Sequence, residues 1–153
     1  MQANSHRRIL HIDDDEQFTR LMGERLRREG YQYACLHDPT EALDELARNE
    51  HHVVLLDIQM PQLNGLELLR QIKRQDGGLQ AIMVTSFVGV GTILQSMRWG
   101  AEACFFKPLM NFQPLVDALE MAFRKRDRWW ITLAEFAHHR REEALLDIAF
   151  ESQ

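Results

Sequence analysis

Carboxylates that could do chemistry follow two apolar runs of this chain. Asp13, Asp14 and Asp15 come directly after "RILHI", and Asp57 comes directly after "VVLL". Carboxylates about 4 Å apart repel each other by about 4 kcal/mol at an effective dielectric constant of about 20, so a cluster of them requires a counter-ion or raised pKa values. An all-oxygen site suits a hard divalent cation, and Mg²⁺ is the usual choice where phosphate is the other ligand. These residues therefore predict a magnesium site.

Two further polar residues end apolar runs in the same way. Thr85 ends "AIMVT", and Lys107 ends "ACFFK". A hydroxyl is a hydrogen-bond donor, and an ammonium is a point charge that pairs with a carboxylate or a phosphoryl oxygen. Because an aspartate carboxylate can act as a nucleophile in phosphoryl transfer, this combination is typical of a site that holds a phosphoryl group in line with an aspartate.

The elements that must position these residues alternate along the chain. The expected strands are 8–12, 31–36, 52–58, 80–86 and 103–107, and the expected helices are 15–30, 38–50, 64–78, 89–101 and a long one from 111 or 112 onward. Alternating strands and helices form right-handed βαβ units, so the pattern predicts an α/β fold with a doubly wound parallel sheet. Ligands of such sheets bind outside the carboxyl ends of the strands. The candidate residues stand at those ends, and we expect them at one rim.

Four separated motifs carry a resemblance to a known family. The segments "HIDDDE", "LLDIQMPQLNG", "MVTSF" and "GAEACFFKP" occur in this order. Together they resemble the receiver domain of two-component response regulators, over about residues 7 to 126. The resemblance implies a flavodoxin-like (βα)5 sheet with strand order 2-1-3-4-5. It also implies that Asp57 accepts a phosphoryl group from the phosphohistidine of a histidine kinase, or from a small phosphodonor.

The resemblance also assigns the metal ligands. Asp13 and Asp14 match the acidic pair that helps to hold Mg²⁺ in the family, and Asp57 completes the carboxylate set. Gln59, two residues after the phosphoacceptor, is expected to contribute only its backbone carbonyl. Mg²⁺ is therefore the expected cofactor.

The remaining roles follow from the same match. Thr85 corresponds to the switch hydroxyl, and Lys107 to the lysine that precedes a proline, here Pro108, which is usually cis in this family. The expected partners are a sensor histidine kinase or a phosphotransfer protein. A homodimer is expected either through the face formed by the fourth helix, fifth strand and fifth helix, or through the C-terminal helix.

Three features depart from the family's pattern. The residue three before the lysine is usually an aromatic that swings inward, whereas here it is Cys104; Phe106, on the same side of the strand by alternation, is a candidate substitute. Ser86 stands where the family mostly has Ala or Gly, and it is either a tolerated small residue or an extra hydroxyl beside the phosphate. Gln59 and Phe87 border the path of the hydrolytic water in the family. The bulk of Phe87 predicts a long-lived aspartyl phosphate.

The end of the chain is expected to lie outside the receiver. We assign residues 1–126 to the receiver and 127–153 to a helical extension or a truncated linker, since no Gly or Pro follows Pro114. Apolar residues continue there at steps of three and four, which predicts a prolonged or second amphipathic helix. The apolar cluster at 129–131 either folds back onto the receiver or forms a helical dimer contact or a docking surface.

Composition restricts the partners and the compartment. A net charge of −5 and a C-terminal segment too short for a helix-turn-helix domain argue against direct nucleic-acid binding. The apolar runs are too short to span a membrane, so we expect a cytoplasmic protein without membrane contact. Cys35 and Cys104 lie within apolar stretches and are predicted to be small buried core residues in a reducing compartment.

Two alternative functions belong to other classes. One is an interaction module that keeps the fold and never accepts phosphate. The other is a hydrolase, because "HIDDDE" contains the Asp-x-Asp of haloacid-dehalogenase-like phosphatases, but that scheme makes Asp13 the nucleophile and requires a cap domain for which the chain has no room. Since the full receiver set is present, we expect a switch that catalyses only its own phosphorylation and dephosphorylation, and no other enzymatic activity.

Overall fold

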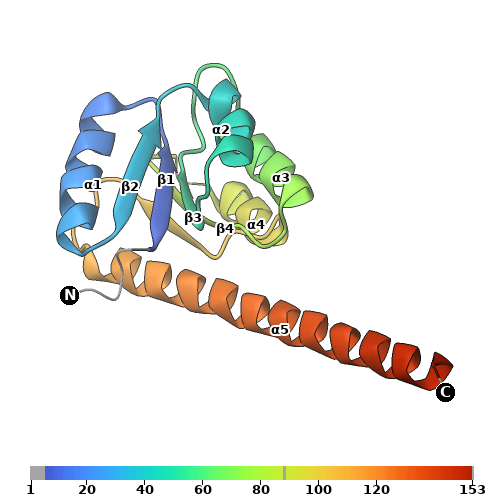
Figure 1. The fold of residues 1–153 in the computed structure, drawn as a ribbon. Helices are drawn as coiled ribbons and strands as arrows, with labels where there is room; N and C mark the ends of the chain where they lie inside the picture. Colours follow the sequence, from blue (N-terminus) through green and yellow to red (C-terminus); the bar gives the residue numbers. More distant parts are fainter. Residues whose placement is uncertain (1–5, 88, 153) are drawn as a thin grey trace.

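A five-stranded parallel sheet with helices on both faces forms the body of the molecule (Figure 1). The computed structural model describes residues 6–87 and 89–152. The strands are β1 (Arg8–Ile12), β2 (Gln32–Leu36), β3 (Val53–Leu56), β4 (Gln80–Thr85) and β5 (Ala103–Phe106). Their order is β2-β1-β3-β4-β5, which confirms the predicted doubly wound sheet and its flavodoxin-like order.

The helices follow the predicted alternation. They are α1 (Glu16–Arg28), α2 (Ala42–Arg48, after a 3-10 turn at Pro39–Glu41), α3 (Gly65–Gln75), α4 (Val90–Arg98) and α5 (Gln113–Glu151). One apolar core packs α1 and the first turns of α5 against the sheet, and a second core packs α2 and α3 against its other face. The central strands β3 and β4 are buried along their whole length because both faces are covered.

The edge position of β2 corrects one prediction. Cys35 was expected in the core, but it lies on β2 and is exposed, because this strand has a neighbour on only one side. Cys104, on the other edge strand, is half-buried and packs against the core. An apolar sequence context predicts a strand, but only the strand order decides whether that strand lies at an edge.

Two glycines are required by the backbone. Gly30 ends the turn after α1 at a φ of 94°, a left-handed conformation that glycine adopts without steric cost. Gly65 begins α3 so close to the preceding loop that a Cβ atom there would lie 1.8 Å from the carbonyl oxygen of Asp57. The Asn64 side chain caps this helix by accepting a hydrogen bond from the Leu66 N–H. The start of α3 therefore fixes the backbone of Asp57.

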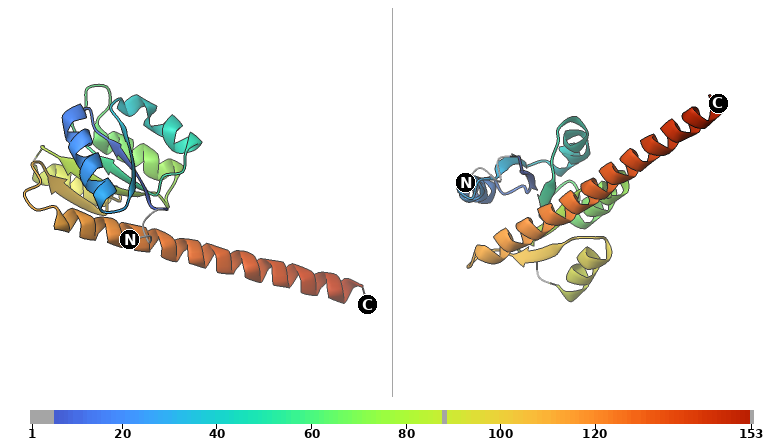
Figure 2. Two further views of the ribbon diagram at one scale, coloured as in Figure 1. Left: turned by 60° about the vertical axis from the view of Figure 1, so that its left-hand side comes forward. Right: turned by 60° about the horizontal axis from the view of Figure 1, so that its bottom comes forward.

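Helix α5 continues far beyond the body of the molecule (Figure 2). Its first turns bury Leu115, Leu119, Ala122 and Phe123 against the sheet, and from residue 127 onward its described residues are exposed. The prolonged form of the predicted helix is therefore the one observed. The cluster at 129–131 does not fold back, since each of its side chains is more than half exposed. Over the residues that the structure describes, no helix combines the length and the apolar character needed to cross a membrane.

Candidate functional site

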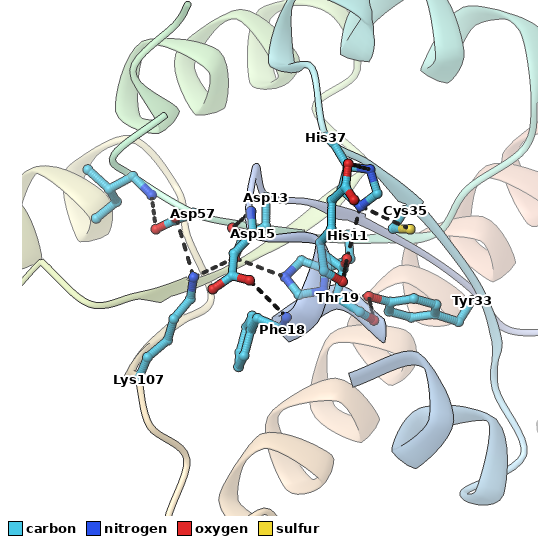
Figure 3. Close-up of polar contacts among 12 residues, drawn as sticks. His11, Asp13, Asp15, Phe18, Thr19, Tyr33, Cys35, His37, Asp57 and Lys107 are labelled. Atoms are coloured by element: carbon cyan, nitrogen blue, oxygen red, sulfur yellow. Dashed lines mark hydrogen bonds and ion pairs between the residues drawn. The ribbon is translucent and has the colours of Figure 1, made fainter. Parts of the chain in front are cut away.

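Charged side chains gather at the carboxyl rim of the sheet, as predicted. Asp13 follows β1, Asp57 follows β3, Thr85 ends β4 and Lys107 follows β5. Lys107 Nζ donates to Asp13 Oδ2 at 2.6 Å and to Asp57 Oδ2 at 3.4 Å (Figure 3). Both aspartates are almost completely inaccessible to solvent. Residues up to 94 positions apart in the chain thus form one polar cluster.

The backbone holds the two buried aspartates in place. Asp57 N–H donates to Ile12 C=O, and the Ile58 N–H donates to Asp57 Oδ1 at 2.8 Å. On the other aspartate, Asp13 Oδ1 accepts the Asp15 N–H at 2.9 Å. One oxygen of each carboxylate is therefore fixed by an amide, and the other faces Lys107.

Three carboxylates could share a cation. Oxygen atoms of Asp13, Asp14 and Asp57 lie within 4.8 Å of one another, and Asp14 is the exposed member. The donor set is all oxygen, which fits Mg²⁺ better than a soft transition metal. Gln59 is exposed in the loop after β3, and the role of its carbonyl as a ligand stays a prediction.

Burial and charge shift the acidities of the two buried aspartates in opposite directions. Burial and the negative charge of Asp13 raise the pKa of Asp57, with Lys107 pulling the other way. Burial alone would also raise the pKa of Asp13, but its hydrogen bonds with Lys107 and with the Asp15 N–H outweigh burial and lower it. Asp57 therefore carries the unfavourable charge of this pair, which a bound cation would stabilise.

The residues around the cluster have distinct environments. Thr85 is buried, its hydroxyl accepts the Phe87 N–H at 3.1 Å, and its C=O accepts the Lys107 N–H at 2.9 Å. Ser86 and Phe87 are exposed beside it. The Lys107–Pro108 peptide bond is cis, which confirms the prediction.

One contact at the site was not predicted from the sequence. The centroid of the Phe18 ring, on α1, lies 4.4 Å from Lys107 Nζ, so a cation–π interaction helps to hold the ammonium. In the sequence Phe18 looks like an ordinary apolar position of a helix. No local signal distinguishes it, because its partner lies 89 positions later in the chain.

A doubly wound sheet with an acidic cluster, a hydroxyl and a lysine at its carboxyl rim defines a receiver-type fold and site. The family model for the response regulator receiver domain matches residues 9–120. The chain belongs to the response regulator receiver family.

Relatives and solved structures agree with this assignment. The uncharacterized transcriptional regulatory protein YkoG of Bacillus subtilis is 31% identical over 117 residues, covering 76% of this chain and 51% of YkoG. The DNA-binding response regulator MtrA of Mycolicibacterium paratuberculosis is 31% identical over 122 residues, covering 78% of this chain and 52% of MtrA. The crystal structure of the response regulator TrrA of Thermotoga maritima in complex with Mg²⁺ and BeF is 29% identical, with a TM-score of 0.69, covering 76% of this chain and 98% of that one.

The relatives also bear on the predicted partners. The chain spans about half the length of YkoG and MtrA. Their names describe a transcriptional regulator and a DNA-binding regulator, which conflicts with the prediction that nucleic acid is no partner. That prediction rested on net charge and on a short C-terminal segment, and neither property describes the part of YkoG or MtrA that lies outside the matched residues.

Proposed function

We propose that this receiver is a phosphorylation switch in which Asp57 is the phosphoacceptor. The observation that supports it best is the placement of Lys107 between Asp13 and Asp57 at a rim where three carboxylates converge. One carboxylate oxygen of Asp57 attacks the phosphorus, the bond from phosphorus to the donor histidine nitrogen breaks, and the proton-bearing imidazole leaves. The phosphoryl donor is a sensor histidine kinase or a phosphotransfer protein.

The cation and the other side chains have separate roles. Mg²⁺, held by Asp13, Asp14, Asp57 and the Gln59 carbonyl, would neutralise charge on the phosphoryl oxygens. Lys107 exchanges its contact with Asp57 for one with a phosphoryl oxygen, while Phe18 and Asp13 keep its ammonium at the rim. Thr85 donates its hydroxyl to another phosphoryl oxygen. The chain catalyses only these reactions of its own aspartate.

The added charge then acts on a partner-binding face. Val90, Leu94 and Met97 form an exposed apolar row on α4, which contacts β5. Phosphorylation shifts a two-state equilibrium that this face reports to a partner, a second copy of the chain included. Cys104, at the usual aromatic position, is half-buried and has no ring that could move. Phe106, which pairs with Thr85 across β4 and β5, is therefore the side chain that moves with Thr85.

The remaining assignments concern the ends and the compartment. Residues 1–126 act as the receiver, and 127–153 as a helical extension in the cytoplasm. Along the extension, Trp130, Leu133, Ala137, Leu145 and Ile148 form a stripe at steps of three, four and eight residues, compatible with a dimer between two α5 helices.

Intact mass spectrometry tests the switch chemistry. We expect incubation with acetyl phosphate and Mg²⁺ to add one phosphoryl group, and we expect EDTA or Asp57→Asn to abolish the gain. A folded protein that stays unmodified with Mg²⁺ present would instead indicate an interaction module that accepts no phosphate. A Phe87→Glu variant then tests the predicted slow hydrolysis: its aspartyl phosphate should decay faster than that of the unaltered chain.

A further inference from the structure

A buried histidine lies directly behind the acidic cluster. His11, near the carboxyl end of β1, has no exposed surface, and its ring packs edge-on against Phe18 and Tyr33. Its Nδ1 lies 2.7 Å from the Tyr33 hydroxyl. Its Nε2 has no hydrogen-bond partner among the residues that the structure describes, and lies 3.7 Å from Asp13 Oδ2 (Figure 3). A buried nitrogen without a partner beside a carboxylate requires an explanation.

The hydrogen bonds of Tyr33 place the protons. The Tyr33 hydroxyl donates its only proton to the Thr19 carbonyl at 2.8 Å, because a carbonyl has no proton to offer. The Tyr33 oxygen must then accept from His11, so Nδ1 carries the imidazole proton. A proton on Nε2 would be donated to Asp13 at hydrogen-bond distance, and the observed 3.7 Å is longer than that, so Nε2 carries no proton and the ring is neutral. It follows that Nε2 presents a lone pair to Asp13.

The lone pair determines which way Asp13 faces. A lone pair of nitrogen and a carboxylate oxygen repel each other, which is consistent with a separation of 3.7 Å instead of a hydrogen-bond distance. Asp13 Oδ2 consequently gains nothing by turning inward, and it binds Lys107 at 2.6 Å on the rim side. We propose that His11, held in this tautomer by Tyr33, is a positioning residue that keeps the Asp13 carboxylate turned toward the cation site.

The inference rests on the proposed function only in naming Mg²⁺ as that cation. Removing the Tyr33 hydroxyl should favour the other neutral tautomer of His11. In Tyr33→Phe the Nδ1 proton has no acceptor, so the neutral ring is more stable with its proton on Nε2, from where it donates to Asp13 Oδ2. That hydrogen bond would draw the carboxylate inward, away from Lys107 and from a metal. Partners of this kind behind a metal ligand change affinity by about tenfold or more when they are lost.

Tyr31 offers a matched control. Its hydroxyl also donates one hydrogen bond, here to the Glu120 side chain, but Tyr31 precedes β2 at the amino end of the sheet, away from the rim. Tyr31→Phe therefore removes a comparable hydrogen bond without touching His11.

The experiment combines Mg²⁺ titration calorimetry with nitrogen-15 NMR of the histidine rings. We expect the unaltered chain to show the Nδ1-protonated tautomer at His11, and Tyr33→Phe to show the Nε2-protonated one with Mg²⁺ affinity about tenfold weaker. Tyr31→Phe should match the unaltered chain in both. An Nε2-protonated His11 in the unaltered chain would overturn the inference, as would a Tyr33→Phe variant that changes tautomer and keeps its affinity.

A metal-independent signal separates this inference from the proposed function. If the unaltered chain binds no Mg²⁺, the proposed function fails. The positioning role of His11 is then tested by the Lys107 side-chain NMR signals in metal-free protein. A shift of these signals in Tyr33→Phe but not in Tyr31→Phe would support the positioning role. Identical Lys107 signals in all three proteins would refute it.

Discussion

At the scale of single residues, the site is a set of charges that the fold leaves incompletely balanced. Lys107 is one cation shared by Asp13 and Asp57, and its shorter contact is with Asp13. The raised pKa of Asp57 expresses the resulting cost of ionising the second carboxylate. Such a residue is stabilised by anything that removes or neutralises its charge.

Neutralising Asp57 should therefore stabilise the metal-free protein. We expect Asp57→Asn to raise the free energy of unfolding by about 1 kcal/mol near pH 7 without Mg²⁺, because repulsion from Asp13 disappears. Mg²⁺ should then stabilise only the unaltered chain. The difference in free energy of unfolding between the two proteins should therefore become smaller or change sign when Mg²⁺ is added. Urea denaturation with and without Mg²⁺ measures both effects. Asp127→Asn, on the exposed part of α5, is the control, and a destabilised metal-free Asp57→Asn would contradict the prediction.

A second residue-scale prediction concerns acid sensitivity. Burial lowers the pKa of His11 below 6.5 in the folded chain, so below that pH the unfolded chain binds more protons and the free energy of unfolding falls. The pKa of His52 is also lowered, chiefly by burial, and this affects the free energy of unfolding in the same direction. The raised pKa of Asp57 acts oppositely, but from an ordinary value of 3.8, so its effect is largest in more acidic solution.

Urea denaturation from about pH 7.5 to about pH 5.5 tests this linkage. One such histidine contributes a slope of at most about 1.4 kcal/mol per pH unit. We expect stability to decline across this range, and His11→Phe to flatten the decline because no proton can bind there. A pH-independent stability of the unaltered chain would show that the buried ring does not resist protonation.

At the scale of elements, the loop between β3 and α3 leaves no room for a residue larger than glycine at position 65. The start of α3 packs on the backbone of the phosphoacceptor, and the N-cap Asn64 orients that start. The loop after β3 therefore transmits the position of α3 to Asp57. Its "NG" signature indicates a turn, but only the folded loop shows that the turn touches the site.

Gly65→Ala tests this coupling. A Cβ atom 1.8 Å from the Asp57 carbonyl oxygen forces the helix and the loop apart, and we expect a loss of more than about 2 kcal/mol in the free energy of unfolding. Phosphorylation by acetyl phosphate should slow as well. Gly91→Ala, in α4, meets open space and should be neutral or stabilising by up to about 1 kcal/mol. Equal stabilities of the two variants would mean that the loop yields without cost.

At the scale of the whole molecule, a compactly packed receiver body is followed by a solvent-exposed helix. The part of α5 beyond residue 126 contributes no buried side chain to the body, and large apolar side chains such as Trp130 and Ile148 are more than half exposed. Exposed apolar surface of this extent marks an interaction site. Stability and association should therefore be separable.

Shortening the chain to residues 1–126 makes this separation measurable. We expect the shortened chain to unfold with unchanged free energy and to accept phosphate as before, but to sediment as a monomer. Within the full chain, Ile148→Glu should weaken self-association at least tenfold, because it places a charge in the stripe. Thr132→Glu, about 160° away around the helix from Trp130, should not. A full chain that is monomeric at high concentration would rule out the dimer through α5.

The sequence by itself determined the alternation of strands and helices, the rim residues and the family, because apolar periodicity and strand-end chemistry are local properties of the chain. The tertiary structure decided the rest. Cys35 is exposed because β2 lies at an edge, and the 129–131 cluster stays in solvent because α5 runs straight past the sheet. The contacts of Phe18 with Lys107 and of His11 with Tyr33 depend on which strands and helices become neighbours. No local pattern encodes that choice, since it follows from burying all the apolar faces at once.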